Sequence, residues 1–467
     1  MKYFYRLLML CLVVEALSGT GVATGQNQRG GKTKPNIVLI FVDDLGYGEL
    51  GCQGNREILT PHIDSIAKNG IRFTDGYVSS PYCCPSRAGL LTGRYQTRFG
   101  HELNAVGDQN IRPNVGLPLT EVTIADVLKR AGYVTGCIGK WHLGGTAKYH
   151  PQKRGFDEFY GFLHEGHFFV PPPYKGVTSR LRPNEPPYDK NNSMLRGTKK
   201  IVEKEYLTDA ITREALSFLE RHKSKPFFLY LPYNAVHSPM QAPHKYLDRN
   251  KHIDDSHRRL FAAMLTSLDD GIGRVLAKLR ELKLEEETVV ILLSDNGGPV
   301  AELTSSNWPL RGGKGQLWEG GVRIPFLIQW KGQLPAGKTY PHPVISLDLF
   351  PTVAAVGGAK LPDERKLDGV NLLPFLTKQS TKEKPHDVLF WRYGANIALR
   401  QGKWKLVKQR KRGQRKPPRF ELFDLSKDIR ETSNLATRQP KKFQALKAEL
   451  HKLNQQMIEP LWGRRRK

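Results

Sequence analysis

The chain has 467 residues, of which 39% are hydrophobic and 25% are charged, and this composition excludes a disordered or fibrous protein. The length exceeds what one hydrophobic core of ordinary size accommodates, so we expect two domains, one large and one small. The formal net charge of +27 favours a polyanionic partner such as nucleic acid, anionic lipid or acidic polysaccharide, although a solvated basic surface without a specific partner explains it equally well.

Residues 1–25 have the pattern of a secretory signal peptide. Lys2 and Arg6 make a positive start, an apolar run follows at 7–14, and small and polar residues come next. The run is too short to span a bilayer and is followed by Glu15, which argues against stable membrane insertion. We therefore expect an exported protein of a periplasmic, extracellular or lysosome-like compartment. Export makes nucleic acid the weakest of the three partners, and we expect none to bind.

Strands and helices alternate along residues 35–385. Continuous apolar runs indicate strands buried on both faces, as in a parallel sheet, at 36–42, 133–138, 227–231, 288–293 and 325–330. Helices are expected between them, at 60–67 (with Thr60 as N-cap), 120–131, 207–221 and 260–282. This alternation predicts an α/β fold with a central, mostly parallel sheet. The Pro- and Gly-rich segment 149–200 is expected to be an insertion that forms a functional wall.

The last part of the chain has a different pattern. Short strands typical of an antiparallel sheet are expected at 388–393, 397–400, 404–407 and 420–425, and an amphipathic helix at 440–457. Residues 386–467 are therefore expected to form a small C-terminal α+β domain. Much of the positive charge lies here, at 403–419 and 464–467.

Polar side chains follow four of the expected strands. They are Asp43, Asp44, Lys140, His142, His237, Asp295 and Asn296. Ligands bind beyond the carboxyl ends of strands in open α/β sheets, so these side chains could converge on one site. A single pair could instead only cap the following helix. The acidic and amide oxygens suit calcium or magnesium better than zinc, and three clustered carboxylates would repel one another without a cation.

Four cysteines lie beyond residue 25, and two of them are neighbours. Cys83 and Cys84 are poor disulfide partners because a bond between adjacent residues is strained, so the chain is not a disulfide scaffold. The pair opens a segment that we interpret as a loop followed by a helix starting near Pro85. A cysteine at a helix N-terminus beside Arg87 would have a lowered pKa and could be a nucleophile. A buried structural cysteine is the alternative.

The segment Cys83-Cys84-Pro85-Ser86-Arg87 with Leu91-Thr92-Gly93-Arg94 resembles the signature of type I sulfatases. Similar blocks occur in family order at 43–44, 139–144, 294–297 and 313–323. Within that family the chain is most similar to the arylsulfatase A and N-acetylgalactosamine-6-sulfatase group. The resemblance implies an alkaline-phosphatase-like large domain, a small C-terminal domain with an antiparallel sheet, and hydrolysis of sulfate esters.

The resemblance also implies two non-standard groups. A formylglycine-generating enzyme would oxidise Cys83, rather than Cys84, to formylglycine (3-oxoalanine), whose hydrate would be the nucleophile. A divalent cation, calcium rather than magnesium, would polarise the sulfate. Its ligands would be Asp43, Asp44, residue 83, Asp295 and Asn296, and Asp295 would also be the base.

Five further catalytic side chains are implied. Arg87 would hold the diol at residue 83. Lys140 and Lys314 would neutralise charge on the sulfuryl oxygens. His142 would take a proton from the second hydroxyl of the diol, and His237 would protonate the leaving alcohol.

Export, positive charge and the aromatic-rich region 156–174 favour a sulfated carbohydrate as substrate. Both a small sulfated molecule and a sulfated polysaccharide fit this expectation. His164 and His167 are expected to line its pocket. Two other hypotheses stay open. One is a phosphonate monoester or phosphodiester hydrolase on the same scaffold, and the other is a non-catalytic protein that binds polyanionic polysaccharides.

Overall fold

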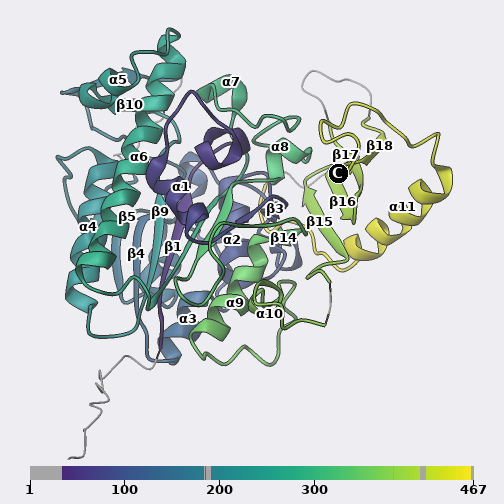
Figure 1. Cartoon of the computed structure of the whole chain (residues 1–467), viewed down its shortest axis with the longest axis horizontal. Helices are drawn as coiled ribbons and strands as arrows, with labels where there is room; N and C mark the ends of the chain where they lie inside the picture. The colour runs from purple at the N-terminus through teal and green to yellow at the C-terminus, as the bar shows by residue number, and fades with distance from the viewer. Residues whose placement is uncertain (1–33, 184, 186–190, 382, 411–416, 464–467) are drawn as a thin grey trace, which may run out of the picture. The chain divides into compact units, whose positions relative to one another are not determined.

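The structure is a computed structural model that describes residues 34–183, 185, 191–381, 383–410 and 417–463. The expected signal peptide at 1–25 lies outside the described residues. Residues from Lys34 onward form one compact unit with two principal sheets (Figure 1). The domain boundary expected at 385–386 remains a prediction. Within the described ranges, no helix combines the length and apolarity needed to cross a bilayer.

A ten-stranded sheet forms the centre of the molecule. Its strands are β1 (Asn36–Val42), β2 (Ile71–Phe73), β4 (Val134–Lys140), β5 (Glu158–Phe162), β7 (Leu195–Arg196), β8 (Lys199–Lys200), β9 (Phe227–Tyr233), β11 (Thr288–Ser294), β12 (Phe326–Gln329) and β13 (Lys338–Tyr340). They lie in the order β13-β2-β12-β11-β1-β9-β4-β5-β7-β8. Two short pairs stand apart, β3 (Gly76–Tyr77) with β14 (Val344–Ile345) and β6 (Val177–Arg180) with β10 (Met240–Pro243).

The expected α/β fold is confirmed, with two differences in detail. The strands β11, β1, β9, β4 and β5 run parallel, and every residue of β1, β9 and β11 is buried, as the continuous apolar runs predict. However, β12 runs antiparallel to both of its neighbours. The segment 149–200 is also more than an insertion, because it supplies β5, whose short apolar run is hidden among glycines and prolines.

Helices cover both faces of this sheet (Figure 1). They are α1 (Pro61–Lys68), α2 (Cys83–Thr92), α3 (Ile124–Arg130), α4 (Leu207–His222), α5 (His244–Arg249), α6 (Ser256–Glu281), α7 (Val300–Leu303), α8 (Glu319–Val322), α9 (Leu349–Val356) and α10 (Leu373–Leu376). Along β1, Val38 and Ile40 pack into a core with α1, α4 and α6, whereas Leu39 and Phe41 pack into a second core with α2, α3 and α9. Alternate side chains of one strand thus join two helical layers.

The start of α1 differs from the expectation. Thr60 makes no side-chain cap, and its hydroxyl instead donates to Asp64 at 3.2 Å. The carboxylate of Asp269, on α6, accepts hydrogen bonds from the backbone N–H groups of His62 at 3.2 Å and Ile63 at 2.8 Å. A residue distant in sequence therefore satisfies the free N–H groups that a local threonine was expected to satisfy.

The C-terminal sheet has the expected antiparallel form. Its strands β15 (Val388–Tyr393), β16 (Asn396–Gln401), β17 (Trp404–Lys408) and β18 (Phe420–Asp424) pair in sequence order. Helix α11 (Pro440–Asn454) buries Leu446 and Leu450 against the sheet. Trp391 links this sheet to the rest of the unit, since its indole N–H donates to the Val78 carbonyl at 2.7 Å.

Three fully buried charged residues join β17 to the loop between β11 and β12. Lys405 Nζ lies 2.8 Å from a carboxylate oxygen of Glu319 and 3.3 Å from one of Glu431. The Glu319 backbone N–H also donates to Glu431 at 2.7 Å. We call these three residues the buried ion cluster. The adjacent Leu317 N–H donates to Gln409 at 2.8 Å, so the C-terminal part of the chain holds this loop from two sides.

Candidate active site

The polar side chains at the strand ends meet at one place. Asp43 and Asp44 follow β1, Asp295 follows β11, and Cys83 begins α2. One oxygen from each carboxylate and the Cys83 sulfur all lie within 4.8 Å of one another. All four residues are buried. The structure thus brings together residues that are up to about 250 positions apart, because parallel strands present their carboxyl ends at one edge of the sheet.

Asp44 has an uncommon backbone conformation, with φ of 65°. Its backbone N–H donates to Asp295 Oδ1 at 3.1 Å, and its Oδ1 accepts from Asn296 Nδ2 at 2.7 Å. These bonds hold the turn after β1 against the turn after β11. The acidic pair is therefore fixed by tertiary contacts rather than used to cap a following helix.

Each carboxylate is paired with a cationic side chain. Arg87 Nη2 lies 2.7 Å from Asp295, Lys140 Nζ 2.5 Å from Asp43, and Lys314 Nζ 2.7 Å from Asp44. The argument that repulsion alone demands a metal is therefore wrong, because these three cations already balance the three carboxylates. The sequence could not show this, since nothing in it pairs Lys314 with Asp44.

The surroundings shift the pKa values of Asp44 and Asp295 in opposite directions. Burial favours neutral Asp44, but Lys314 and His237 outweigh burial and lower the pKa of Asp44 to about 2. Burial and the neighbouring Asp43 raise the pKa of Asp295 to about 6, although Arg87 opposes the change. Asp295 thus holds a proton more readily than Asp44 does.

Two buried oxygens fit a metal better than they fit the protein alone. Among the described residues, Asp43 Oδ1 and Asn296 Oδ1 accept no hydrogen bond, and both residues are fully buried. Asp43 Oδ1 has only a longer ion pair, 3.6 Å from Arg87 Nη2. Unpaired buried oxygens are costly unless something else binds them. With Asp44 and Asp295 they make an all-oxygen donor set, which suits a hard divalent cation.

Cys83 is not placed to act as a free thiolate. It begins α2, two residues earlier than the expected start at Pro85, and it is 1% exposed. Burial, with the charge of Asp295, raises its pKa well above the usual value. The lowered pKa expected from a helix N-terminus and a nearby arginine is therefore wrong, because desolvation dominates and Arg87 is engaged by Asp295.

Cys84 has a different partner. Its sulfur lies 2.9 Å from His101 Nε2, and His101 Nδ1 bonds to the Gly116 carbonyl at 3.1 Å. Burial raises the pKa of Cys84 to about 12 and lowers the pKa of His101 to about 3, so a neutral thiol donates to a neutral imidazole. The two adjacent cysteines therefore face different environments, one at the carboxylates and one in the core.

The two expected catalytic histidines are both near the cluster. His237 Nδ1 bonds to the Ser238 carbonyl at 2.6 Å, and its Nε2 lies 3.7 Å from Asp44 Oδ2. His142 is fully buried and its Nε2 bonds to the Ala105 carbonyl at 2.7 Å. Burial lowers the pKa of both, to about 3 for His237 and well below the usual value for His142. Both rings are therefore neutral.

A cavity of about 590 Å³ opens above Cys83, and we call it the reaction cavity. Cys83, His237 and Lys314 line it on the side of the carboxylates. The rest of its wall includes residues that sequence reasoning missed. They are Tyr82, Asn104, Val106, Glu165, Arg182, Pro183, Pro299 and Glu302. For Glu165, Arg182 and Pro183 the sequence gave one indication of this role, because they lie in segment 149–200, which was expected to form a wall.

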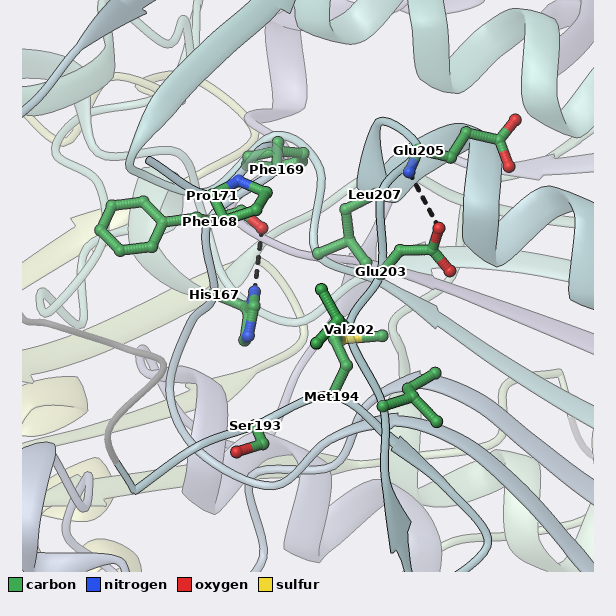
Figure 2. A pocket seen from close by; sticks show the side chains of 11 residues that line it. His167, Phe168, Phe169, Pro171, Ser193, Met194, Val202, Glu203, Glu205 and Leu207 are labelled. Carbon is green, nitrogen blue, oxygen red and sulfur yellow. Dashed lines mark hydrogen bonds between the residues drawn. The ribbon is translucent and has the colours of Figure 1, made fainter. Parts of the chain in front are cut away.

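Neither His164 nor His167, which were expected to line the substrate pocket, is among the residues that line the reaction cavity. His167 lines a separate cavity of about 270 Å³, whose wall also includes Phe169 and Met194 (Figure 2). His167 Nδ1 donates to the Phe168 carbonyl at 2.9 Å. Their neighbour Glu165 occupies the reaction cavity instead. The composition of segment 149–200 predicted that it forms a wall. It did not predict which of its residues line the reaction cavity.

The chain matches known proteins over most of its length. Residues 35–359 match the Sulfatase family model, and residues 313–459 match the model for the C-terminal part of N-sulphoglucosamine sulphohydrolase. N-acetylgalactosamine-6-sulfatase of Sus scrofa is 34% identical, with 84% of this chain and 74% of that protein covered. Steryl-sulfatase of Mus musculus is 33% identical, with 85% and 74% covered.

A solved structure agrees with these matches. The crystal structure of Ps i-CgsB in complex with k-i-k-neocarrahexaose has a TM-score of 0.83 and 36% sequence identity, over 92% of this chain and 94% of that chain. The protein is therefore a hydrolase that acts on sulfate esters. It belongs to the sulfatase family, and the resemblance read from its signature and the expected alkaline-phosphatase-like fold are both confirmed.

Proposed function

We propose that this sulfatase removes sulfate from a sulfated carbohydrate, with formylglycine at residue 83 and with calcium in the all-oxygen site. The observation that carries the proposal is the meeting of Cys83 with three carboxylates below an open cavity. Two similar proteins point to carbohydrates, one named for N-acetylgalactosamine 6-sulfate hydrolysis and one solved with a neocarrahexaose.

The wall of the reaction cavity favours a sugar as the substrate. A sterol is the alternative, because another relative is named steryl-sulfatase. Asn104, Glu165, Arg182 and Glu302 all lie on it. These groups already bond within the protein, Glu165 to Asn110 at 2.7 Å and Arg182 to Glu302 at 3.1 Å, yet covering them with a hydrocarbon skeleton would remove their remaining hydration. Hydroxyl groups of a sugar would instead form hydrogen bonds with them.

The two added groups have separate tasks. The cation, bound by Asp43, Asp44, Asp295, Asn296 and residue 83, would polarise the sulfate and acidify the attacking hydroxyl. Formylglycine would supply that hydroxyl in its hydrated form. The Asp43 and Asn296 oxygens that accept no hydrogen bond support the metal. Calcium is favoured because it accepts many oxygen ligands in irregular arrangements, whereas magnesium requires a near-ideal octahedron.

The remaining side chains act through charge and position. Arg87 fixes Asp295, the proposed base, through its 2.7 Å ion pair. Lys140 and Lys314 would stabilise negative charge on the sulfuryl oxygens. Lys314 and His237 line the cavity and would contact the leaving oxygen. His237 would protonate that oxygen after the anionic sulfate, bound beside the ring, has favoured its charged form. His142, buried behind residue 83, would accept a proton from the second hydroxyl of the hydrate.

A substrate screen tests this function. Protein produced together with a formylglycine-generating enzyme should release sulfate from at least one sulfated saccharide with a higher kcat/KM than from an aryl sulfate. Chelation should abolish the activity, and calcium should restore it better than magnesium. An aryl phosphodiester and a steroid sulfate serve as comparison substrates.

The same screen can contradict the proposal in two ways. Faster cleavage of the phosphodiester would make the protein a diesterase on the sulfatase scaffold. Turnover of aryl or steroid sulfates without release of sulfate from any saccharide would refute the carbohydrate substrate. Equal activity before and after chelation would remove the metal from the proposal.

A further inference from the structure

The reaction cavity is one of three hollows that adjoin in series. A second hollow, of about 770 Å³, shares Pro299, Glu302 and Lys314 with the reaction cavity. A third, of about 330 Å³, shares Ser306 and Trp308 with the second. The segment from α7 to α8, whose helices are labelled in Figure 1, thus supplies walls to all three hollows.

Trp308 stands out in this depression because its side chain is 63% exposed. Among the described residues, it is the single exposed side chain of the types Trp, Tyr and Phe. Exposing an indole to water forgoes the stabilisation that its burial would give, so such a residue commonly marks a binding surface. The flat apolar face of an indole suits the C–H face of a pyranose ring, while the ring hydroxyls point sideways to polar groups.

Polar groups are present beside Trp308. Ser305 lines the second hollow and is 1% exposed, and its hydroxyl has no hydrogen-bond partner among the described residues. Thr304 lines the third hollow, and its hydroxyl likewise has none within the described ranges. Both hydroxyl oxygens are themselves buried, so the polar groups open to a ligand here come from other lining residues, such as Ser306 and Lys314. Glu302 adds a carboxylate where the first two hollows adjoin.

We infer that the second hollow is a subsite for the sugar residue next to the sulfated one, with Trp308 as the stacking surface. The substrate is then an oligosaccharide or polysaccharide bound across at least two rings. The reaction cavity, of about 590 Å³, and the second hollow, of about 770 Å³, each have room for one sugar ring, because ligand pockets of this volume hold whole small molecules. This inference rests on the proposed function and specifies its substrate.

Two substrates of different length test the subsite. An aryl sulfate reaches only the reaction cavity and serves as the reference, whereas a sulfated oligosaccharide reaches both. We expect Trp308→Ala to lower the ratio of kcat/KM for the oligosaccharide to that for the aryl sulfate about tenfold, mainly through KM. Trp308→Phe, which keeps a flat ring, should restore most of the ratio.

The control is Leu119→Ala, an exposed apolar residue outside the three hollows, which should leave the ratio unchanged. Melting temperatures of all variants check the fold. An unchanged ratio in Trp308→Ala, with sulfate still released from saccharides, overturns the subsite and leaves the proposed function intact. A wild-type enzyme that cleaves no saccharide sulfate overturns both. Tighter binding of alkyl-chain sulfates by wild type than by Trp308→Ala would assign the hollow to an apolar group and also overturn the inference.

Discussion

Cys83→Ala should abolish sulfate-ester hydrolysis, whereas Cys84→Ala should keep most of it. The two thiols are adjacent, equally buried and of one chemical type, so they form a matched pair. Cys83 lies within reach of the three carboxylates, while Cys84 is bonded to His101 in the core. Loss of a nucleophile costs on the order of 10⁴-fold or more in kcat. Loss of the buried Cys84 thiol should instead lower the free energy of unfolding by about 1 kcal/mol.

The measurements are kcat on an aryl sulfate, peptide mass spectrometry of the segment around residue 83, and a melting curve. Mass spectrometry should find the aldehyde at residue 83 in wild type and in Cys84→Ala. Substantial turnover by Cys83→Ala would contradict the proposed nucleophile. So would an active wild-type sample in which residue 83 is still entirely a thiol.

Lys405→Met should destabilise the protein by about 3–5 kcal/mol and also reduce activity. Methionine roughly keeps the volume of the lysine chain but removes the ammonium from both carboxylates. Glu319 keeps Arg323 at 3.3 Å, whereas Glu431 stays buried beside the negative charge of Glu319. Breaking a buried ion pair from one side is costly for that reason. Activity should fall because Glu319 lies five residues after Lys314, on the loop that the buried ion cluster holds. Urea unfolding and kcat measured on the folded fraction give the two effects.

Glu431→Gln is the matched variant, and it should behave differently with pH. Burial raises the pKa of Glu431 to about 7, Lys405 opposes this change, and Glu319 adds to it. A carboxyl with a raised folded-state pKa contributes stability below its ordinary pKa of about 4.5, and this contribution is lost as the pH rises through about 7. Glu431→Gln should therefore gain stability relative to wild type between about pH 5 and pH 8. A parallel pH dependence in both proteins would contradict the assignment.

The long buried elements could be predicted from the sequence because their signals are local. The strands β1, β9 and β11 are continuous apolar runs, and such runs mark strands covered on both faces. Direction is not a local property, so the antiparallel β12 could not be told from its parallel neighbours. The short β5 was missed because five residues among glycines and prolines carry too little pattern.

The site could be predicted in part, for a similar reason. Strand ends converge in any parallel sheet, so the meeting of Asp43, Asp44 and Asp295 follows from their positions after strands. Contacts between loops do not follow from any spacing. Asp269 replacing Thr60 as the cap of α1 is one such contact, and the wall formed by Arg182 is another.

The buried ion cluster joins β17 to the segment that carries Lys314, and this contact has a consequence for biosynthesis. The signature at residue 83 and the first ligand strand are made early, but Lys405 and Glu431 emerge from the ribosome only after about nine-tenths of the chain. A nascent or prematurely ended chain therefore contains every proposed catalytic residue. It still lacks the buried ion cluster that holds the segment carrying Lys314. We therefore expect a chain that ends before Lys405 to hydrolyse sulfate esters more slowly than the full chain.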